Sequence, residues 1–184
     1  MIVGDPAIFA IESQITKAFE RLSFRGLGYF VIHIAGRQYG VREPEATMLA
    51  VSFDEVGGRL GRQGKHLSNF SLASNPGTLA DMYRKAFYNV GADKEMKSFA
   101  DAILSAGISW APDGDEAFDD GSYVLQFDVE GWVRLIGFRC GADGLHDPTT
   151  LSDTWLSSAQ FYGVLEKWQA DFLKEWTTSV KVSE

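Results

Sequence analysis

The sequence is poor in cysteine: Cys140 is the only one among its 184 residues. A lone cysteine cannot form a disulfide within the chain, and it leaves no second thiol for a cysteine-based zinc site. Free cysteines are among the most often buried residues, and Cys140 closely follows the apolar segment that ends at Phe138. We therefore expect a packed or half-exposed structural thiol, in a protein suited to a reducing compartment.

Long apolar runs are also missing. No stretch approaches the ~20 uncharged apolar residues that a transmembrane helix requires. The first residues carry no basic cluster, and Asp5, Glu12 and Lys17 interrupt the apolar residues before the hydrophobic region of a signal peptide could form. The sequence therefore predicts a cytoplasmic protein that does not bind a membrane.

Positive charge is in short supply. The chain has 17 Lys and Arg against 25 Asp and Glu, which gives a formal net charge of −8 at pH 7. Such a balance argues against direct binding to nucleic acid, because phosphates attract basic surfaces. It allows electrostatic steering toward a basic partner, although solubility alone would also explain it.

What the sequence does contain is the composition of a folded globular protein, with 45% apolar and 23% charged residues. The length suits a single domain spanning residues 1–184. Apolar runs rich in β-branched and aromatic residues predict strands at 7–11, 29–34, 39–41, 122–129 and 132–139. Apolar residues three to four apart predict helices at 12–22, 44–60, 78–89, 93–104 and 151–176. This order predicts an α+β fold, with a mainly antiparallel sheet packed against several helices and a long amphipathic C-terminal helix.

Glycines are concentrated between Gly57 and Gly64, in a segment that fits a flexible loop or a helix end. A phosphate-binding P-loop needs Gly, four residues, and then Gly-Lys-Ser/Thr. If Gly64-Lys65 is taken as the Gly-Lys pair, Arg59 stands at the leading glycine position and His66 at the hydroxyl position. The mismatch favours a loop with solvated basic side chains. A small hydrolase or ligand-binding enzyme that uses this loop stays the alternative hypothesis.

The three histidines, His33, His66 and His146, lie far apart in the sequence. None has the i, i+4 spacing of a helical zinc pair, and no G-x-S-x-G nucleophile motif is present. A Ser-His-Asp triad assembled from distant residues stays open, because such triads do not depend on sequence order. We expect no enzyme, no metal and no cofactor, and we nominate no catalytic residue.

An acidic segment precedes the predicted strand at 122–129. Its carboxylates are Asp113, Asp115, Glu116, Asp119 and Asp120. A calcium-binding EF-hand loop counted from Asp113 would need Gly at the sixth position and Glu at the twelfth, where the chain has Phe118 and Val124. The segment is therefore interpreted as a solvated acidic loop or as a docking surface for a basic partner.

Three tryptophans, Trp155, Trp168 and Trp176, fall within the predicted C-terminal helix. Tryptophans at helical spacing are more often core residues than part of a ligand site. We therefore expect the apolar side of this helix to pack on the core, with its mixed charges facing solvent.

Several short stretches carry a family resemblance. The opening Ile-Val-Gly-Asp-Pro at 2–6, followed by Phe-Ala-Ile at 9–11, resembles the start of the Immunity protein 42 family of bacterial polymorphic toxin systems. The stretch LGYFVIHIAG at 27–36 is similar to the next strand and turn of that family. The segments YVLQF at 123–127 and VRLIGF at 133–138, after the acidic loop, are also similar, and the Trp- and Phe-bearing C-terminal segment more loosely so.

The resemblance implies a cytoplasmic protein that binds and neutralises a cognate toxin C-terminal domain, often encoded just upstream. Neutralisation would come from occluding the toxin active site or blocking its closure, and Asp5 and Pro6 would serve the fold. A basic toxin such as a nuclease would suit the charge of −8. We place the five acidic-loop carboxylates at the rim of the toxin contact, around a few aromatic anchors. A regulatory interaction module without a toxin is a further alternative.

Overall fold

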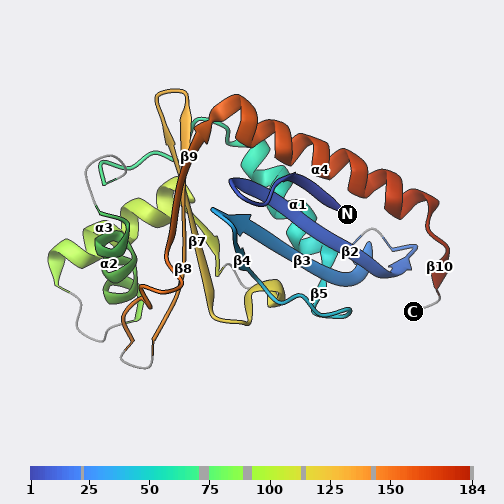
Figure 1. Cartoon of the computed structure of the whole chain (residues 1–184), viewed down its shortest axis with the longest axis horizontal. Coiled ribbons are helices and arrows are strands. Elements are labelled where there is room, and N and C mark those ends of the chain that lie inside the picture. Colours follow the sequence, from blue (N-terminus) through green and yellow to red (C-terminus); the bar gives the residue numbers. More distant parts are fainter. Residues whose placement is uncertain (22, 71–74, 89–92, 113–114, 142–143, 183–184) are drawn as a thin grey trace.

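The protein is described by a computed structural model of residues 1–184, apart from 22, 71–74, 89–92, 113–114, 142–143 and 183–184. A four-stranded sheet stands at the centre (Figure 1). Helices α2 (Pro76–Tyr88) and α3 (Lys94–Ala106) lie on one side of it. A second sheet lies on the other side with helices α1 (Leu49–Gly61) and α4 (Ser158–Thr178).

The central sheet has the strand order β6-β7-β8-β9 and is antiparallel throughout. Its strands are β6 (Ser109–Ala111), β7 (Ser122–Val129), β8 (Trp132–Arg139) and β9 (Ser152–Ser157). The second sheet follows β1-β2-β3-β4, while β5 pairs with β3, and β10 pairs with β2 in parallel. Its strands are β1 (Ile2–Asp5), β2 (Phe9–Phe19), β3 (Gly26–Ile34), β4 (Arg37–Tyr39), β5 (Thr47–Met48) and β10 (Lys181–Val182). The predicted α+β class is confirmed.

Several predicted elements are confirmed almost to the residue. The hairpin formed by β7 and β8 has the predicted bounds, and Glu130 and Gly131 form its two-residue turn with φ values of 45° and 88°. Helices α2 and α3 differ from the prediction by a few residues, and Asp93 caps α3 by accepting a hydrogen bond from the amide of Met96. These elements carry complete local signals, namely turn, cap and periodicity.

The helix predicted at 12–22 is wrong, because this segment continues strand β2 as far as Phe19. Within β2, Ile11 and Ser13 face the α4 side of the sheet, and Glu12 lies on the opposite face. Strand β2 pairs with β1 on one side and with β3 on the other. This pairing outweighs the helical spacing of a few apolar residues.

The helix predicted at 151–176 is wrong over its first turns, where strand β9 runs as far as Ser157. Helix α4 starts only after a capping box, in which Ser157 and Gln160 bond each other's backbone amides. The helix predicted from Pro44 likewise begins later, at Leu49, because Thr47 and Met48 pair with β3 as strand β5. In both cases a short strand precedes the helix without a break in the apolar pattern.

The two sheets and the helices enclose two hydrophobic clusters. The first contains Ile11 and Phe30 of one sheet, Leu135 of the other, and Trp168 and Phe172 of α4. The second lies between the central sheet and the pair α2–α3. Trp168 is therefore a core residue as predicted, whereas Trp155 is not, since it lies in β9 and is 40% exposed. None of the described helices combines the length and apolarity that a bilayer span requires.

Candidate functional site: an exposed tryptophan surface

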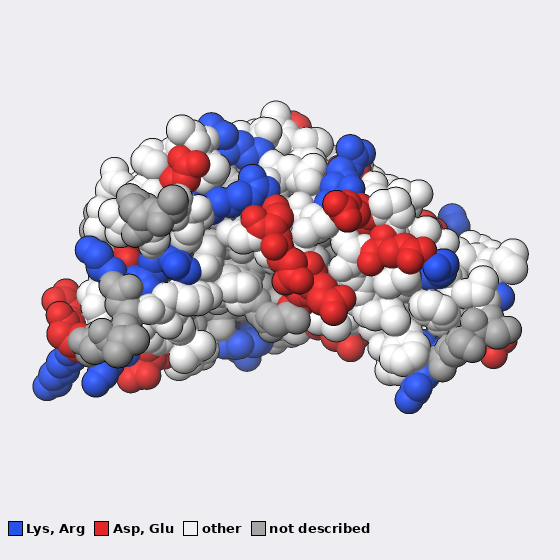
Figure 2. Space-filling view, turned by 90° about the horizontal axis from the view of Figure 1, so that it is seen from below, with Lys and Arg blue, Asp and Glu red and all other residues white. Residues whose placement is uncertain are grey.

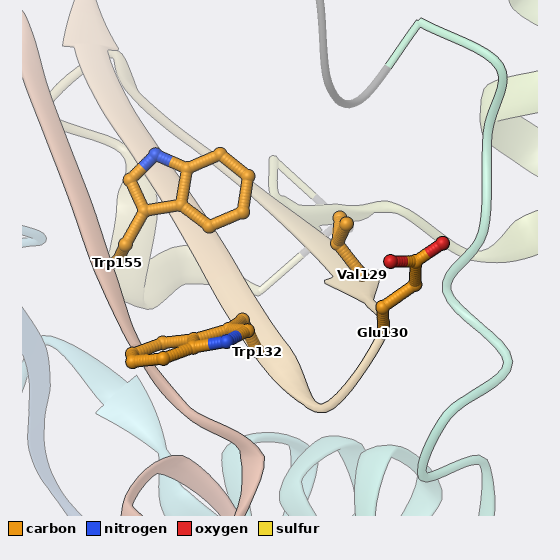
Figure 3. Close-up of a pocket in the computed structure, with 4 residues that line it drawn as sticks. All are labelled: Val129, Glu130, Trp132 and Trp155. Atoms are coloured by element: carbon orange, nitrogen blue, oxygen red, sulfur yellow. The ribbon is translucent and has the colours of Figure 1, made fainter.

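Two tryptophans are exposed side by side on the central sheet. In the pairing of β8 with β9, Trp132 lies opposite Ser157 and Arg134 lies opposite Trp155, so the two indoles are diagonal neighbours on one face. Figure 3 shows both rings beside the tip of the β7–β8 hairpin. Further along this face, Phe127 and Ile136 pack into the cluster under α2 and α3, but Trp132 remains 52% exposed and Trp155 40% exposed.

Two shallow depressions flank the tryptophan pair. One, of about 470 Å³, is lined by Val129, Glu130 and both tryptophans. The other, of about 430 Å³, lies toward the N-terminal turn and the start of α4. Its lining is Asp5, Ile8, Phe9, Trp132, Trp155, Leu156, Gln160 and Val164. We call the lining of both depressions the tryptophan surface. Among these described residues two carry a carboxylate and none carries a basic group.

Trp155 lies against a buried ion pair on the same face of the sheet. Arg134 is 4% exposed, and its Nε and Nη2 each donate a hydrogen bond of 2.8 Å to the carboxylate of Asp153. Its guanidinium carbon lies 5.4 Å from the centroid of the Trp155 ring. Such a two-point pair offsets the arginine charge and restricts the arginine side chain next to the indole. Trp155 is therefore fixed in orientation although its outer face is exposed.

The hairpin turn beside the tryptophans carries an unusual residue. Glu130 adopts a φ of 45°, in the left-handed region that asparagine and glycine tolerate best. Two-residue turns of this type favour Asn-Gly, so a glutamate in the first position costs stability. Its carboxylate is placed at the rim of the depression that contains Trp132 and Trp155.

The predicted acidic loop divides into structural and exposed carboxylates. Asp115 is only 4% exposed and accepts hydrogen bonds from Thr47 Oγ1 at 2.5 Å and Ser52 Oγ at 2.6 Å. Because it is buried, Asp115 does not lie at a solvated rim. Its side chain instead caps the short 3₁₀ helix Glu116–Phe118 from inside the protein. Asp120 forms a 2.6 Å ion pair with Arg139.

Glu116 and Asp119 are exposed, whereas Asp113 lies outside the described residues. On the face seen in Figure 2, carboxylates gather in a band near the middle, with Lys and Arg on both sides. The acidic segment leads into the start of β7, whereas the tryptophans lie beside its far end. Seven residue steps of about 3.3 Å separate those ends, so roughly 23 Å of strand lies between the two surfaces.

A second polar cluster lies on the outer face of the N-terminal sheet. Glu12 is 5% exposed and accepts hydrogen bonds from Tyr29 Oη at 3.0 Å and Arg42 Nε at 2.8 Å. Its other oxygen lies 3.0 Å from His33 Nε2. Burial alone would raise the pKa of Glu12, but the hydrogen bonds from His33, Tyr29 and Arg42 outweigh it and lower the pKa. The cluster therefore stabilises the charged form of the Glu12 carboxylate.

Replacing Glu12 with glutamine is expected to lower the free energy of unfolding by about 1–3 kcal/mol at pH 7, because charged hydrogen bonds are lost. Since the folded-state pKa of Glu12 lies below its ordinary 4.5, its stabilising effect is complete above pH 4.5. The effect is lost as the pH falls through the folded-state pKa. Urea unfolding of wild type and E12Q at pH 7 and pH 3 tests this.

The exposed Glu20 serves as the matched control. The E20Q variant should follow wild type at both pH values. An E12Q deficit that is as large at pH 3 as at pH 7 would contradict the assignment to the charged carboxylate.

The three histidines serve separate parts of the fold. His33 lies against Glu12, and His146 Nδ1 lies 2.6 Å from Asp81 on α2. His66 donates from Nδ1 to the carbonyl oxygens of Ala106 and Gly107, and burial followed by the nearby charge of Arg59 lowers its pKa. They do not converge on one centre. Within the described residues, no group of three or more His, Cys, Asp or Glu is arranged to hold a metal.

The glycine-rich segment does not form the loop that the enzyme hypothesis needs. Gly57, Gly58 and Gly61 lie within helix α1, which ends at Gly61. Gly57 lies against the α4 side chain of Gln169, where a Cβ would come within 3.0 Å of the amide nitrogen. A helix interior bonds its own amides, so it cannot cradle a phosphate as a glycine loop does.

Sequence reasoning missed the tryptophan surface. It placed Trp132 at the start of a strand and Trp155 inside a helix, so the two residues could not be recognised as neighbours. The available signal lay after the Glu-Gly turn, where Trp132 and Arg134 stand two residues apart and so share one face of the strand. A charged side chain on that face is unusual for a strand buried on both faces.

Comparisons with known proteins relate the sequence and the fold, rather than the tryptophan surface, to other proteins. A family model described as Immunity protein 42 matches residues 1–171. The fold is also similar to the crystal structure of CdiI from Burkholderia dolosa AUO158, with a TM-score of 0.59 and 14% sequence identity. That match covers 93% of this chain and 99% of the other. At this identity the likeness shows a shared fold. No curated protein matches the chain significantly.

Proposed function

Because the chain belongs to the Immunity protein 42 family, we propose that it protects its cell by binding and neutralising a cognate toxin domain. The observation that carries this proposal is the family match over residues 1–171. The bound protein occludes the toxin active site or blocks the closure that the toxin needs. It acts as a non-enzymatic inhibitor, so the complex is the functional state.

The geometry of the described residues supports an inhibitor over an enzyme. The histidines hold separate structural contacts, and the glycines proposed for a ligand loop lie mostly in a helix. What the surface offers instead is a pair of half-exposed tryptophans with carboxylates at the rim. Exposed aromatic groups of this kind are frequent anchors in protein complexes.

The proposal also states where the protein acts, which class of molecule it binds and how many domains it has. The protein acts in the cytoplasm as one domain over residues 1–184, and it binds protein rather than nucleic acid or membrane. The net charge of −8 disfavours contact with phosphate backbones and favours a toxin with a basic face, such as a nuclease.

Co-expression with the toxin C-terminal domain encoded next to this chain tests the proposal. We expect the two proteins to co-purify and cell growth to be restored. A toxin that neither co-purifies nor loses its toxicity would refute it.

The exposed acidic-loop carboxylates are proposed to steer the toxin rather than to anchor it. Reversing Glu116 and Asp119 to lysine is expected to lower the association rate by about 10-fold at low salt, because long-range attraction is weakened. The difference from wild type should shrink at high salt, where charges are screened. Stopped-flow association rates at two salt concentrations measure this.

The double variant E166K/E175K reverses the charge of two carboxylates on α4, of which Glu166 is exposed and Glu175 is half-exposed. It changes the net charge by the same amount and therefore controls for net charge alone. Equal rate losses in both double variants would show that total charge matters, and that the acidic loop has no special role.

A further inference from the structure

We propose that the toxin docks on the tryptophan surface, with Trp132 and Trp155 as anchors, and that the docked face is basic with an apolar centre. This inference rests on the proposed function and deepens it, since it names the contact surface and the partner chemistry. The acidic loop near the start of β7 would then lie outside the contact.

Exposure is the first reason. Trp132 and Trp155 are 52% and 40% exposed, and Ile8 beside them is 46% exposed. Large apolar side chains grouped in this way mark interaction sites more often than scattered surface residues do. Tryptophan is also the residue type that most often dominates binding energy at the centre of an interface.

Charge complementarity is the second reason, and it favours a basic partner over a second copy of this chain. Asp5 and Glu130 are exposed carboxylates of the lining, while the guanidinium of Arg134, next to Trp155, is paired with Asp153. A basic partner would meet these carboxylates favourably. A second copy of this chain in a twofold dimer would bring the same tryptophans and the same carboxylates together, so like charges would oppose.

The turn conformation is the third reason. Glu130 is kept at a φ of 45°, where asparagine or glycine would be less strained. Strained residues of this kind cluster at functional sites. Glu130 lines the same depression as both tryptophans, and its carboxylate lies on the Val129 side of it, where a basic partner could meet it.

Preorganisation is the fourth reason. Trp155 is supported by the Arg134–Asp153 pair, and Trp132 begins a strand whose backbone is paired on both sides. Anchors that are already ordered lose less conformational freedom on binding, so more of their contact energy appears as affinity.

The test compares the double variant W132A/W155A with wild type. Calorimetric titration uses the toxin C-terminal domain encoded next to this chain, separated from its complex in denaturant and refolded. We expect the affinity to fall at least about 100-fold, because two anchors are removed together. The control L104A removes an apolar side chain on α3 that is 62% exposed, and it should bind as wild type does. Thermal unfolding of each variant confirms folding.

A second variant tests the turn without touching the tryptophans. E130N is expected to raise the unfolding midpoint by about 2 °C, since the strain is relieved. It should also slow association with the toxin at low salt, because a carboxylate is lost. An E130N protein that gains stability and binds as fast as wild type would show that the Glu130 turn takes no part in docking, and this would count against the proposed surface.

The outcomes separate the inference from the proposed function. If wild type fails to bind the toxin, the proposed function fails. If wild type binds and folded W132A/W155A binds equally well, the docking surface is wrong while the function stands. If wild type is a dimer that W132A/W155A dissociates, the surface holds a second copy, which also overturns the proposal.

Discussion

Replacing Trp168 with alanine is expected to lower the free energy of unfolding by about 3–5 kcal/mol. Trp168 is fully buried at 0% exposure, and its ring contacts Phe30 and Phe172 with centroid distances of 5.1 and 5.3 Å. Its indole nitrogen donates a 2.9 Å hydrogen bond to Ser13 Oγ. Truncation would therefore leave a cavity between α4 and the N-terminal sheet and an unpaired hydroxyl.

Trp132 provides a control with the same change of side chain. Because it is 52% exposed, W132A should cost far less stability than W168A. Urea unfolding of both variants with wild type measures the difference. Equal losses would contradict the assignment of Trp168 to the core and Trp132 to the surface.

Replacing Arg59 with alanine is expected to cost about 3–5 kcal/mol, because breaking a buried ionic network leaves its other members without partners. Arg59 is 2% exposed and donates to Gln126 Oε1 at 2.9 Å and to the Ser109 carbonyl oxygen at 2.7 Å. It also pairs with Glu55 at 2.8 Å and stacks 4.6 Å from the Trp110 ring. The side chain thus joins helix α1 to two strands of the central sheet.

An exposed ion pair on α4 gives the comparison for Arg59. Lys167 pairs with Asp171 at 2.6 Å, but its side chain is 64% exposed. Surface pairs of this kind contribute little, so K167A should leave the unfolding midpoint almost unchanged. An R59A variant as stable as K167A would show that the buried network contributes nothing to holding α1 on the central sheet.

Local signals explain the parts of the fold that the sequence predicted. The hairpin of β7 and β8 is specified by two apolar runs and a two-residue turn, and α3 by an Asp93 cap and a Gly107 end. The segment at 12–22 has no comparable turn or cap residues at its ends. Its state depends on the pairing of β2 with β1 and β3, which no short window of sequence reveals.

The candidate site was harder to predict, because it depends on residues that are distant in sequence. Asp115 looked like any other carboxylate of an acidic loop, but its neighbours Thr47 and Ser52 come from another part of the chain. Trp155 was assigned to a helix, so its position beside Trp132 could not be inferred. The family resemblance indicated the function without indicating the surface.

The scaffold explains how such a surface can stay exposed without endangering the fold. The central sheet is covered by a core cluster on each face, so the exposed tryptophans contribute little to either core. Selection can therefore act on the tips of β8 and β9 for binding while Trp168 and Arg59 hold the layers together. Separate residues thus carry stability and recognition.

We propose that this protein neutralises its toxin by binding alone, without making or breaking a bond. Native mass spectrometry of the complex isolated from rescued cells tests it most directly, followed by the same measurement after denaturation. We expect a complex whose mass equals the sum of the two chains, and a toxin of unaltered mass after separation. A cleaved or modified toxin, or rescued cells that contain no complex, would contradict it.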